Sequence, residues 1–141
     1  MNKNGDIIII GEDEDNRQTL ISVFEEITEE NKYDNRLVLV DDSTEAYNFL
    51  KSPDCDPFII LSDIKMHSHD GFTLRNVIFS DEELREHPVP FIFLTAGSNP
   101  DHIKEAYQMS IQGYFTKPSN RTDFKNMLAG ILTYWKFSTT P

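Results

Sequence analysis

Short apolar runs alternate with segments of helical period along this chain of 141 residues, and that alternation restricts its fold more than any other feature. Five runs are rich in Ile, Val and Phe and are mostly apolar on both faces. Such runs are typical of strands in a parallel sheet that is covered on both sides. The predicted strands are residues 6–10, 36–40, 58–61, 89–94 and 113–116.

Segments with helical period lie between and after these strands. The clearest, at about residues 121–137, carries an apolar stripe of Phe124, Met127, Leu128, Ile131, Leu132 and Trp135. The stripe predicts a helix that packs onto the sheet rather than a cofactor site. In the first helix Leu20, Phe24 and Ile27 recur at three- and four-residue steps, and Ser43 and Asp101 are candidate N-caps of the second and fourth helices.

Five strands alternating with five helices predict an α/β fold, namely a doubly wound five-stranded parallel sheet with right-handed crossovers. In such sheets, ligands bind at the carboxyl ends of the strands, beside the point where the strand order reverses. In a flavodoxin-like sheet of order 2-1-3-4-5, that point lies between the first and third strands. We expect one domain over residues 1–141, with its core at about residues 5–137 and no output domain.

Composition and charge argue against several classes of protein. The net charge of −11 argues against binding to nucleic acid or to anionic lipid, because phosphate contacts need a basic surface. No apolar run is longer than four residues, and the N-terminus lacks a secretory signal, so we expect a cytoplasmic protein without a membrane span. The single cysteine, Cys55, allows neither an intrachain disulfide nor a cysteine metal cluster.

Chemically useful side chains follow four of the predicted strands. Glu12 and Asp13 follow the first, Asp63 the third, Thr95 the fourth and Lys117 the fifth. The carboxyl ends of parallel strands meet at one edge, so we expect carboxylates facing a lysine, a site for Mg²⁺ and a phosphoryl group. Taken singly, Asp63 is as well explained as a loop cap and Lys117 as a salt-bridge partner. The four strand ends together favour a site.

These segments resemble response-regulator receiver domains (the CheY-like family) over essentially the whole chain. The resemblance lies in residues 7–17, residues 60–66 with Asp70-Gly71, residues 91–96 and residues 113–118. It implies a single-domain response regulator of a two-component phosphorelay. Asp63 would accept a phosphoryl group from a sensor histidine kinase and form an acyl phosphate. The C-terminus, residues 134–136, resembles the subgroup that pairs with bacterial phytochrome-like kinases.

The same resemblance implies the metal ligands. Mg²⁺ would bind Asp63, an acid after the first strand (Glu12 or Asp13) and the backbone carbonyl of Lys65. The protein would not be an enzyme acting on a separate substrate. It would catalyse only its own phosphotransfer and slow dephosphorylation.

Three further residues receive roles from the resemblance. Lys117 would neutralise phosphoryl charge, since phosphoryl transfer depends mostly on positioning and charge neutralisation. Thr95 and Tyr114 would form the switch, with Thr95 moving toward the phosphoryl group and Tyr114 swinging inward. The bond between Lys117 and Pro118 would be cis, as is usual in the family.

Three positions depart from the family pattern. Gly11 stands where the first of two adjacent acids is usual, Glu12 replaces the usual Asp at the second, and His67 replaces a proline. We expect weaker magnesium binding, by roughly 1 kcal/mol. Gly11 and Glu12 also leave open a pseudo-receiver, an interaction module that keeps the fold without using phosphorylation.

His67 and His69 are too few for a structural zinc site, and Lys65 stands where a haloacid-dehalogenase-type phosphatase needs an aspartate. We expect signalling through a downstream phosphotransfer or target protein. The family's face of fourth helix, fifth strand and fifth helix is a candidate homodimer surface, with an aromatic set of Tyr107, Tyr114, Phe115 and Trp135 near it.

Overall fold

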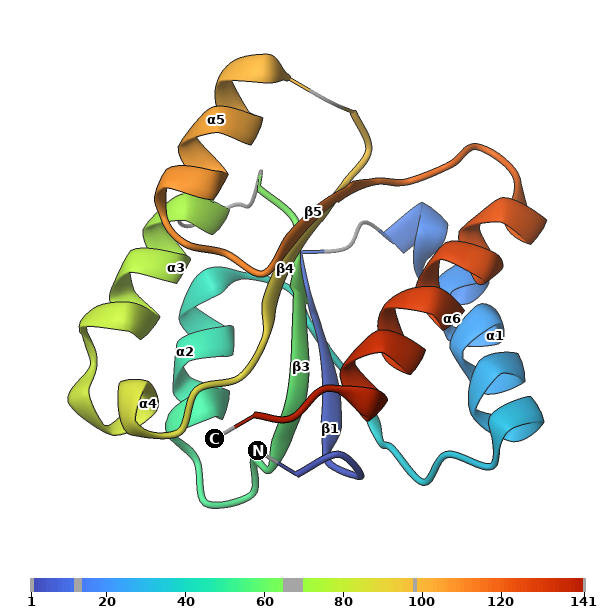
Figure 1. The fold of residues 1–141 in the computed structure, drawn as a ribbon, viewed down its shortest axis with the longest axis horizontal. Helices are drawn as coiled ribbons and strands as arrows, with labels where there is room; N and C mark the ends of the chain where they lie inside the picture. Colours follow the sequence, from blue (N-terminus) through green and yellow to red (C-terminus); the bar gives the residue numbers. More distant parts are fainter. Residues whose placement is uncertain (1, 12–13, 65–69, 98, 141) are drawn as a thin grey trace.

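Five parallel strands form one sheet in the order β2-β1-β3-β4-β5, as predicted (Figure 1). The computed structural model describes residues 2–11, 14–64, 70–97 and 99–140, with backbone alone for residues 14–16. The strands are β1 Asp6–Ile10, β2 Leu37–Val40, β3 Pro57–Ser62, β4 Phe91–Thr95 and β5 Gly113–Thr116. The prediction for β4 began two residues too early. Pro90 has no N–H to donate to a neighbouring strand, although its carbonyl accepts a hydrogen bond from the Ile60 N–H at 2.9 Å.

Six helices are described rather than the five expected. They are α1 Glu14–Asn31, α2 Ser43–Lys51, α3 Gly71–Ser80, α4 Glu82–Glu86, α5 Pro100–Gln108 and α6 Arg121–Phe137. The additional helix, α4, is five residues long and is capped by Asp81, whose carboxylate accepts from the Leu84 N–H at 3.1 Å. The predicted fourth and fifth helices are therefore α5 and α6.

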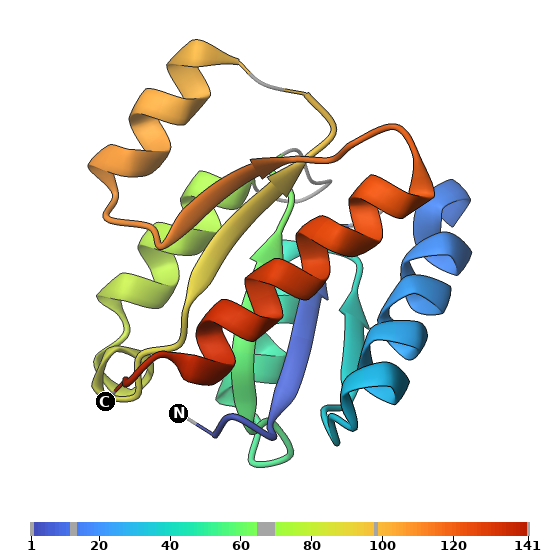
Figure 2. The same ribbon diagram turned by 45° about the vertical axis from the view of Figure 1, so that its right-hand side comes forward.

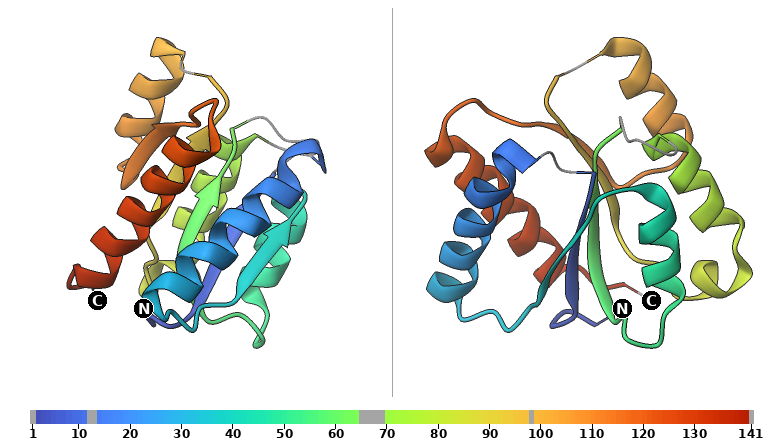
Figure 3. Two further views of the ribbon diagram at one scale, coloured as in Figure 1. Left: turned by 90° about the vertical axis from the view of Figure 1, so that its right-hand side faces the viewer. Right: turned by 180° about the vertical axis from the view of Figure 1, so that it is seen from behind.

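The helices cover both faces of the sheet, with α1 and α6 on one face and α2, α3 and α5 on the other (Figures 1 and 3). Alternate residues of each strand point to opposite faces. In β1, Ile7 and Ile9 join the core under α1 and α6, whereas Ile8 and Ile10 join the core under α2, α3 and α5. A sheet buried on both faces explains why the strands are almost continuously apolar.

Helix α6 runs across one face of the sheet (Figure 2). The stripe predicted from sequence is confirmed: Phe124, Leu128, Ile131 and Leu132 are buried. Two further members, Met127 and Trp135, are partly buried against the same core. In the part of the chain that the structure describes, no helix is long and apolar enough to cross a bilayer.

Both predicted N-caps were wrong by one or two residues. Asp42 caps α2 by accepting from the Glu45 N–H at 2.9 Å, and Ser43 is the first helical residue. Asn99 caps α5, and the N–H of Asp101 is one of the donors it satisfies, at 2.9 Å. A cap must precede the helix so that its side chain can reach back to the orphan N–H groups.

Candidate functional site

Asp63 follows directly after β3 and is tied to the end of β1. Its backbone N–H donates to the Ile10 carbonyl at 3.0 Å, which continues the β1–β3 pairing one residue beyond the strand. Its carboxylate Oδ1 accepts from the Ile64 N–H at 2.7 Å, and the residue is partly exposed. The carboxylate therefore lies at the carboxyl edge of the sheet, beside the point where the chain leaves β1.

Gly71, the first residue of α3, lies against the residues that directly follow β3. Its N–H donates to the Ile64 carbonyl at 2.6 Å. A Cβ at this position would lie 2.4 Å from the Asp63 carbonyl oxygen and 2.7 Å from the Phe93 ring, so only glycine lets α3 begin this close. Asp70 caps the same helix through the Thr73 N–H at 2.8 Å. The Asp70-Gly71 motif thus has a structural role: Asp70 caps α3, and Gly71 lets the helix begin close to Asp63.

Thr95 ends β4 and Lys117 directly follows β5, the two strands that continue the sheet from β3. Thr95 is 6% exposed at the end of β4, and its hydroxyl donates to the Gly97 carbonyl at 2.6 Å. The Lys117 N–H donates to the Thr95 carbonyl at 2.7 Å, which brings the residue after β5 beside the end of β4. The structure therefore places Asp63, Thr95 and Lys117 on three adjacent strands at one edge, as the strand-end pattern predicted.

The expected cis bond before Pro118 is absent. No cis peptide occurs among the described residues, which include Lys117 and Pro118. The trans form is the intrinsically preferred state of an X–Pro bond. The position of Lys117 instead follows from the backbone hydrogen bond to Thr95.

Gly11 ends β1 in a conformation that other residues rarely adopt. Its φ is 82°, in the left-handed region, and its N–H donates to the Val40 carbonyl at 2.9 Å. Glycine adopts this backbone without strain, whereas a side chain would clash with the following carbonyl. The glycine that stands in place of the family's usual acid at position 11 thus allows the chain to leave β1 with a left-handed backbone.

Of the predicted metal ligands, Asp63 lies among the described residues. Glu12, Asp13 and Lys65 lie outside the described residues, as do His67 and His69. Within residues 2–11, 14–64, 70–97 and 99–140, no three His, Cys, Asp or Glu side chains form a metal-binding group. The Asp63 carboxylate is a hard oxygen donor of the kind that Mg²⁺ prefers. It lies beside the end of β1, because the Asp63 N–H donates to the carbonyl of Ile10.

Tyr114 lies in β5 with its hydroxyl turned into the protein. The hydroxyl is buried and has no hydrogen-bond partner in the described part of the chain. The Tyr114 ring meets Phe93 at 6.2 Å between centroids, and Phe93 meets Phe72 at 5.2 Å. These three rings link the start of α3, next to Gly71, to β5. Tyr114 was predicted from sequence to have a role, but Phe72 and Phe93 were not. Phe72 directly follows Gly71, and Phe93 lies two residues before Thr95, so their places beside these motif residues could have indicated them.

The aromatic residues of the candidate dimer face differ in exposure. Tyr107 on α5 is 57% exposed. Tyr114, Phe115 and Trp135 are only partly exposed, because each packs against one of the two cores. Tyr134 at the end of α6 is 65% exposed.

The chain matches known proteins along most of its length. The model of the response regulator receiver domain matches residues 7–129. Response regulator Rcp1 of Synechocystis sp. is 26% identical over 95% of this chain and 91% of its own length. Chemotaxis protein CheY-3 of Vibrio cholerae is 30% identical over 91% of this chain and 92% of its own length.

Solved structures show the same fold. The phosphorylated cyanobacterial phytochrome response regulator RcpA has a TM-score of 0.81 and 23% identity, covering 96% of each chain. The Mn²⁺-bound form of Rcp1 has a TM-score of 0.79 and 24% identity, covering 96% of this chain and 97% of its own. With the sheet order and the family match, the conclusion is direct: this chain belongs to the response regulator receiver domain family.

Proposed function

We propose that this domain is a working response regulator that accepts a phosphoryl group on Asp63 from a sensor histidine kinase. One observation carries the proposal. A partly exposed carboxylate, a threonine hydroxyl and a lysine stand at the ends of three adjacent strands, at Asp63, Thr95 and Lys117. That edge is where doubly wound sheets bind their ligands.

The transfer needs few protein groups. A carboxylate oxygen of Asp63 attacks the phosphorus of a phosphohistidine, and the phosphorus–nitrogen bond breaks. The electron pair and a proton return to the imidazole of the kinase, and an acyl phosphate remains on Asp63. Slow attack by water on the phosphorus restores the carboxylate and releases inorganic phosphate.

A divalent cation fits the donor set proposed for the site. Asp63, Glu12 or Asp13, and the Lys65 carbonyl would hold Mg²⁺, and all of these present the hard oxygens it prefers. When bound, the cation neutralises phosphoryl charge. The Mn²⁺-bound form of Rcp1 supports divalent-metal use in this family. Because Gly11 and Glu12 replace the usual pair of aspartates, we expect the dissociation constant for Mg²⁺ to be raised by about fivefold, the equivalent of about 1 kcal/mol.

Thr95 and Tyr114 form the proposed switch. The Thr95 hydroxyl now donates to the Gly97 carbonyl, and it must leave that oxygen to donate to a phosphoryl oxygen instead. The buried, unpartnered hydroxyl of Tyr114 means that its ring already lies inward, at 6.2 Å from Phe93. Phosphorylation would therefore stabilise this inward position rather than create it.

A pseudo-receiver that signals without phosphorylation is the second candidate. Gly11 and Glu12 favour it, because they leave the end of β1 without the usual pair of aspartates. Incubating the protein with acetyl phosphate and Mg²⁺, followed by intact mass spectrometry, separates the two functions. We expect one added phosphoryl group on the wild type and none on Asp63→Asn. A folded wild type that gains no mass would establish the pseudo-receiver.

The output of the domain is proposed to be contact with another protein, either a downstream target or a second copy. The α5–β5–α6 face is the candidate, with Tyr107 as its most exposed member among the aromatic set predicted there. Light scattering with and without acetyl phosphate measures the oligomeric state. We expect phosphorylation to favour the dimer and Tyr107→Ser to weaken it. A monomer both with and without acetyl phosphate would contradict the proposed dimer.

A further inference from the structure

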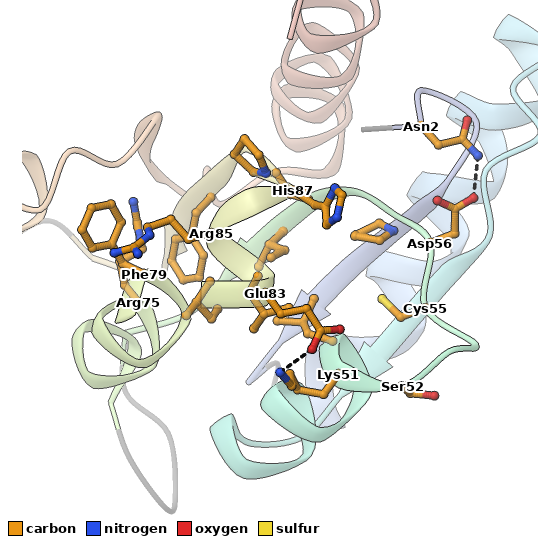
Figure 4. A pocket seen from close by; sticks show the side chains of 18 of the residues that line it. Asn2, Lys51, Ser52, Cys55, Asp56, Arg75, Phe79, Glu83, Arg85 and His87 are labelled. Atoms are coloured by element: carbon orange, nitrogen blue, oxygen red, sulfur yellow. Dashed lines mark hydrogen bonds and ion pairs between the residues drawn. The ribbon is translucent and has the colours of Figure 1, made fainter. Parts of the chain in front are cut away.

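A cavity of about 840 Å³ lies at the opposite end of the sheet from Asp63, near the amino ends of β3 and β4 (Figure 4). Side chains of α2, α3 and α4 line it, together with the loops that precede β3 and β4. Its volume is typical of small-molecule sites. Much of the wall is apolar, formed by Leu50, Ile60, Ile78, Leu84, Val89 and Phe91.

Arg75 is the buried charge in this wall. It is 8% exposed and lies on α3 three residues after Phe72 and three before Ile78, so the helix turns it toward the interior. Its Nε is buried without a hydrogen-bond partner, and Arg75 makes no ion pair among the described residues. Burial alone lowers the pKa of its guanidinium, with no carboxylate nearby to raise it.

Aromatic rings compensate this charge only in part. The Arg75 guanidinium lies 5.0 Å from the ring centroid of Phe79 and 5.8 Å from that of Phe91. Such cation–π contacts attract the charge, but they give the buried Nε–H of Arg75 no oxygen acceptor. Buried charges in proteins are normally paired, so an anion is the group this site lacks.

The other charges that line the cavity have partners or stand exposed. The Lys51 ammonium pairs with Glu83 at 2.8 Å and with Asp81 at 3.2 Å. The Asp56 carboxylate accepts from the Asn2 amide at 2.6 Å, at the far end of the cavity from Arg75 (Figure 4). Arg85 and His87 are exposed. Because Glu83 and Asp56 would repel a second negative charge, the ligand that fits is a monoanion.

We propose that this cavity binds a small carboxylic acid with an apolar body, its carboxylate on the Arg75 guanidinium and its hydrocarbon against the apolar wall. A planar guanidinium matches a carboxylate through two parallel hydrogen bonds. The hydrocarbon would cover Ile78 and Leu84 and the ring of Phe79, which is 54% exposed without a ligand. The site is independent of phosphorylation, because it lies at the other end of the sheet.

The test uses the full ¹⁵N-labelled chain and three acids: benzoate, 3-phenylpropionate and 4-methylpentanoate. The Nε–Hε signal of Arg75 reports hydrogen bonding at the proposed site. We expect at least one acid to shift this signal with a dissociation constant of about 1 mM or lower. Its neutral amide should bind at least about tenfold more weakly, since a charge-assisted hydrogen bond is lost. This comparison needs no variant.

Two variants of matched chemistry locate the site. Arg75→Met should remove the preference for acid over amide and raise the melting temperature of the ligand-free protein, because it removes an uncompensated charge. Arg85→Met, at an exposed position on the same cavity, should keep the preference within about twofold. Asp63→Asn should bind the acid as the wild type does. No shift with any acid, equal binding of acid and amide, or an unchanged preference in Arg75→Met would each overturn the proposal.

Discussion

Two aspartates at opposite ends of the sheet differ in how far hydrogen-bond donors enclose their carboxylates. Asp6, at the amino end of β1, is 5% exposed and accepts two hydrogen bonds from Arg36, at 2.9 and 3.0 Å, and one from the Asp56 N–H at 3.2 Å. Asp63, at the carboxyl end of β3, is partly exposed and accepts from the Ile64 N–H. The first acid is enclosed by donors, whereas the second keeps the access that an incoming phosphoryl group needs.

The difference follows from the direction of the strands. Parallel strands place all their carboxyl ends at one edge, where the loops carry polar side chains toward a ligand. At the amino edge the charges mostly bind one another, as Asp6 binds Arg36 and Asp81 binds Lys51. Arg75 is an exception at this edge, because its buried Nε–H has no hydrogen-bond partner among the described residues.

The largest expected effect comes from filling the space beside Asp63. Gly71→Ala would place a methyl group 2.4 Å from the Asp63 carbonyl, and we expect a loss of about 3 kcal/mol in unfolding free energy. Urea denaturation measures it. Gly130→Ala is the matched control, because nothing lies within 4 Å of its Cβ position on α6. That control should be neutral or stabilise by up to about 1 kcal/mol. Equal stabilities for the two variants would refute the close approach at Gly71.

Exchanging the acids for amides tests the comparison itself. Asp6→Asn should cost about 2 kcal/mol, because an amide cannot accept both Arg36 hydrogen bonds and the one from Asp56. Asp63→Asn should change the unfolding free energy by no more than about 0.5 kcal/mol while abolishing phosphorylation. Chemical denaturation of both variants decides this. The reverse order of stabilities would contradict the assignment of structural and chemical roles.

Gly11 tests whether the backbone at the end of β1 matters to stability. Gly11→Ala forces a side chain into the left-handed region, and we expect a loss of about 1 kcal/mol. The melting temperature, compared with that of Gly97→Ala at an unobstructed position, measures this cost. A variant as stable as the wild type would show that the β1–α1 loop accepts another backbone conformation.

The smallest expected effect is a pH dependence at Asp81. Its carboxylate accepts from the Tyr47 hydroxyl at 2.6 Å and from the Leu84 N–H, and these bonds lower its pKa from 3.8 to about 2. A lowered folded-state pKa adds stability above the unfolded value, and that stability is lost as the pH falls toward 2. Asp81→Asn should therefore be less stable than wild type at pH 5, with a gap that narrows below pH 3.8. A gap independent of pH would contradict this role of the charge.

The strands and the main helices could be predicted from sequence because their signals lie within short stretches of the chain, whereas the sheet order followed from the doubly wound architecture they imply. The apolar stripe of α6 recurs with helical period, and the apolar runs of β1 and β3 are as short as buried strands usually are. Helix α4 was missed because five residues carry too little periodicity, and its cap at Asp81 needed the structure to be recognised. The N-cap predictions, Ser43 and Asp101, were wrong because each stands within two residues of another capable polar residue, the true caps Asp42 and Asn99. Side-chain type alone therefore does not select the cap.

The candidate site was predictable at the strand ends and not beyond them. Asp63, Thr95 and Lys117 stand out because polar residues there interrupt apolar patterns. The burial of Arg75 could not be foreseen, since an arginine in an apolar stripe usually reaches solvent with its charged end. In the fold, the rings of Phe79 and Phe91 lie beside the guanidinium instead.

The central claim is that Asp63 carries the phosphoryl group, and reductive trapping tests it most directly. After incubation with acetyl phosphate and Mg²⁺, borohydride reduces an acyl phosphate to an alcohol and so converts the phosphorylated aspartate to homoserine. Peptide mass spectrometry then identifies the position. We predict homoserine at position 63 alone, with Asp6 unchanged. Homoserine at another acid, or none at all in a folded protein, would contradict the account.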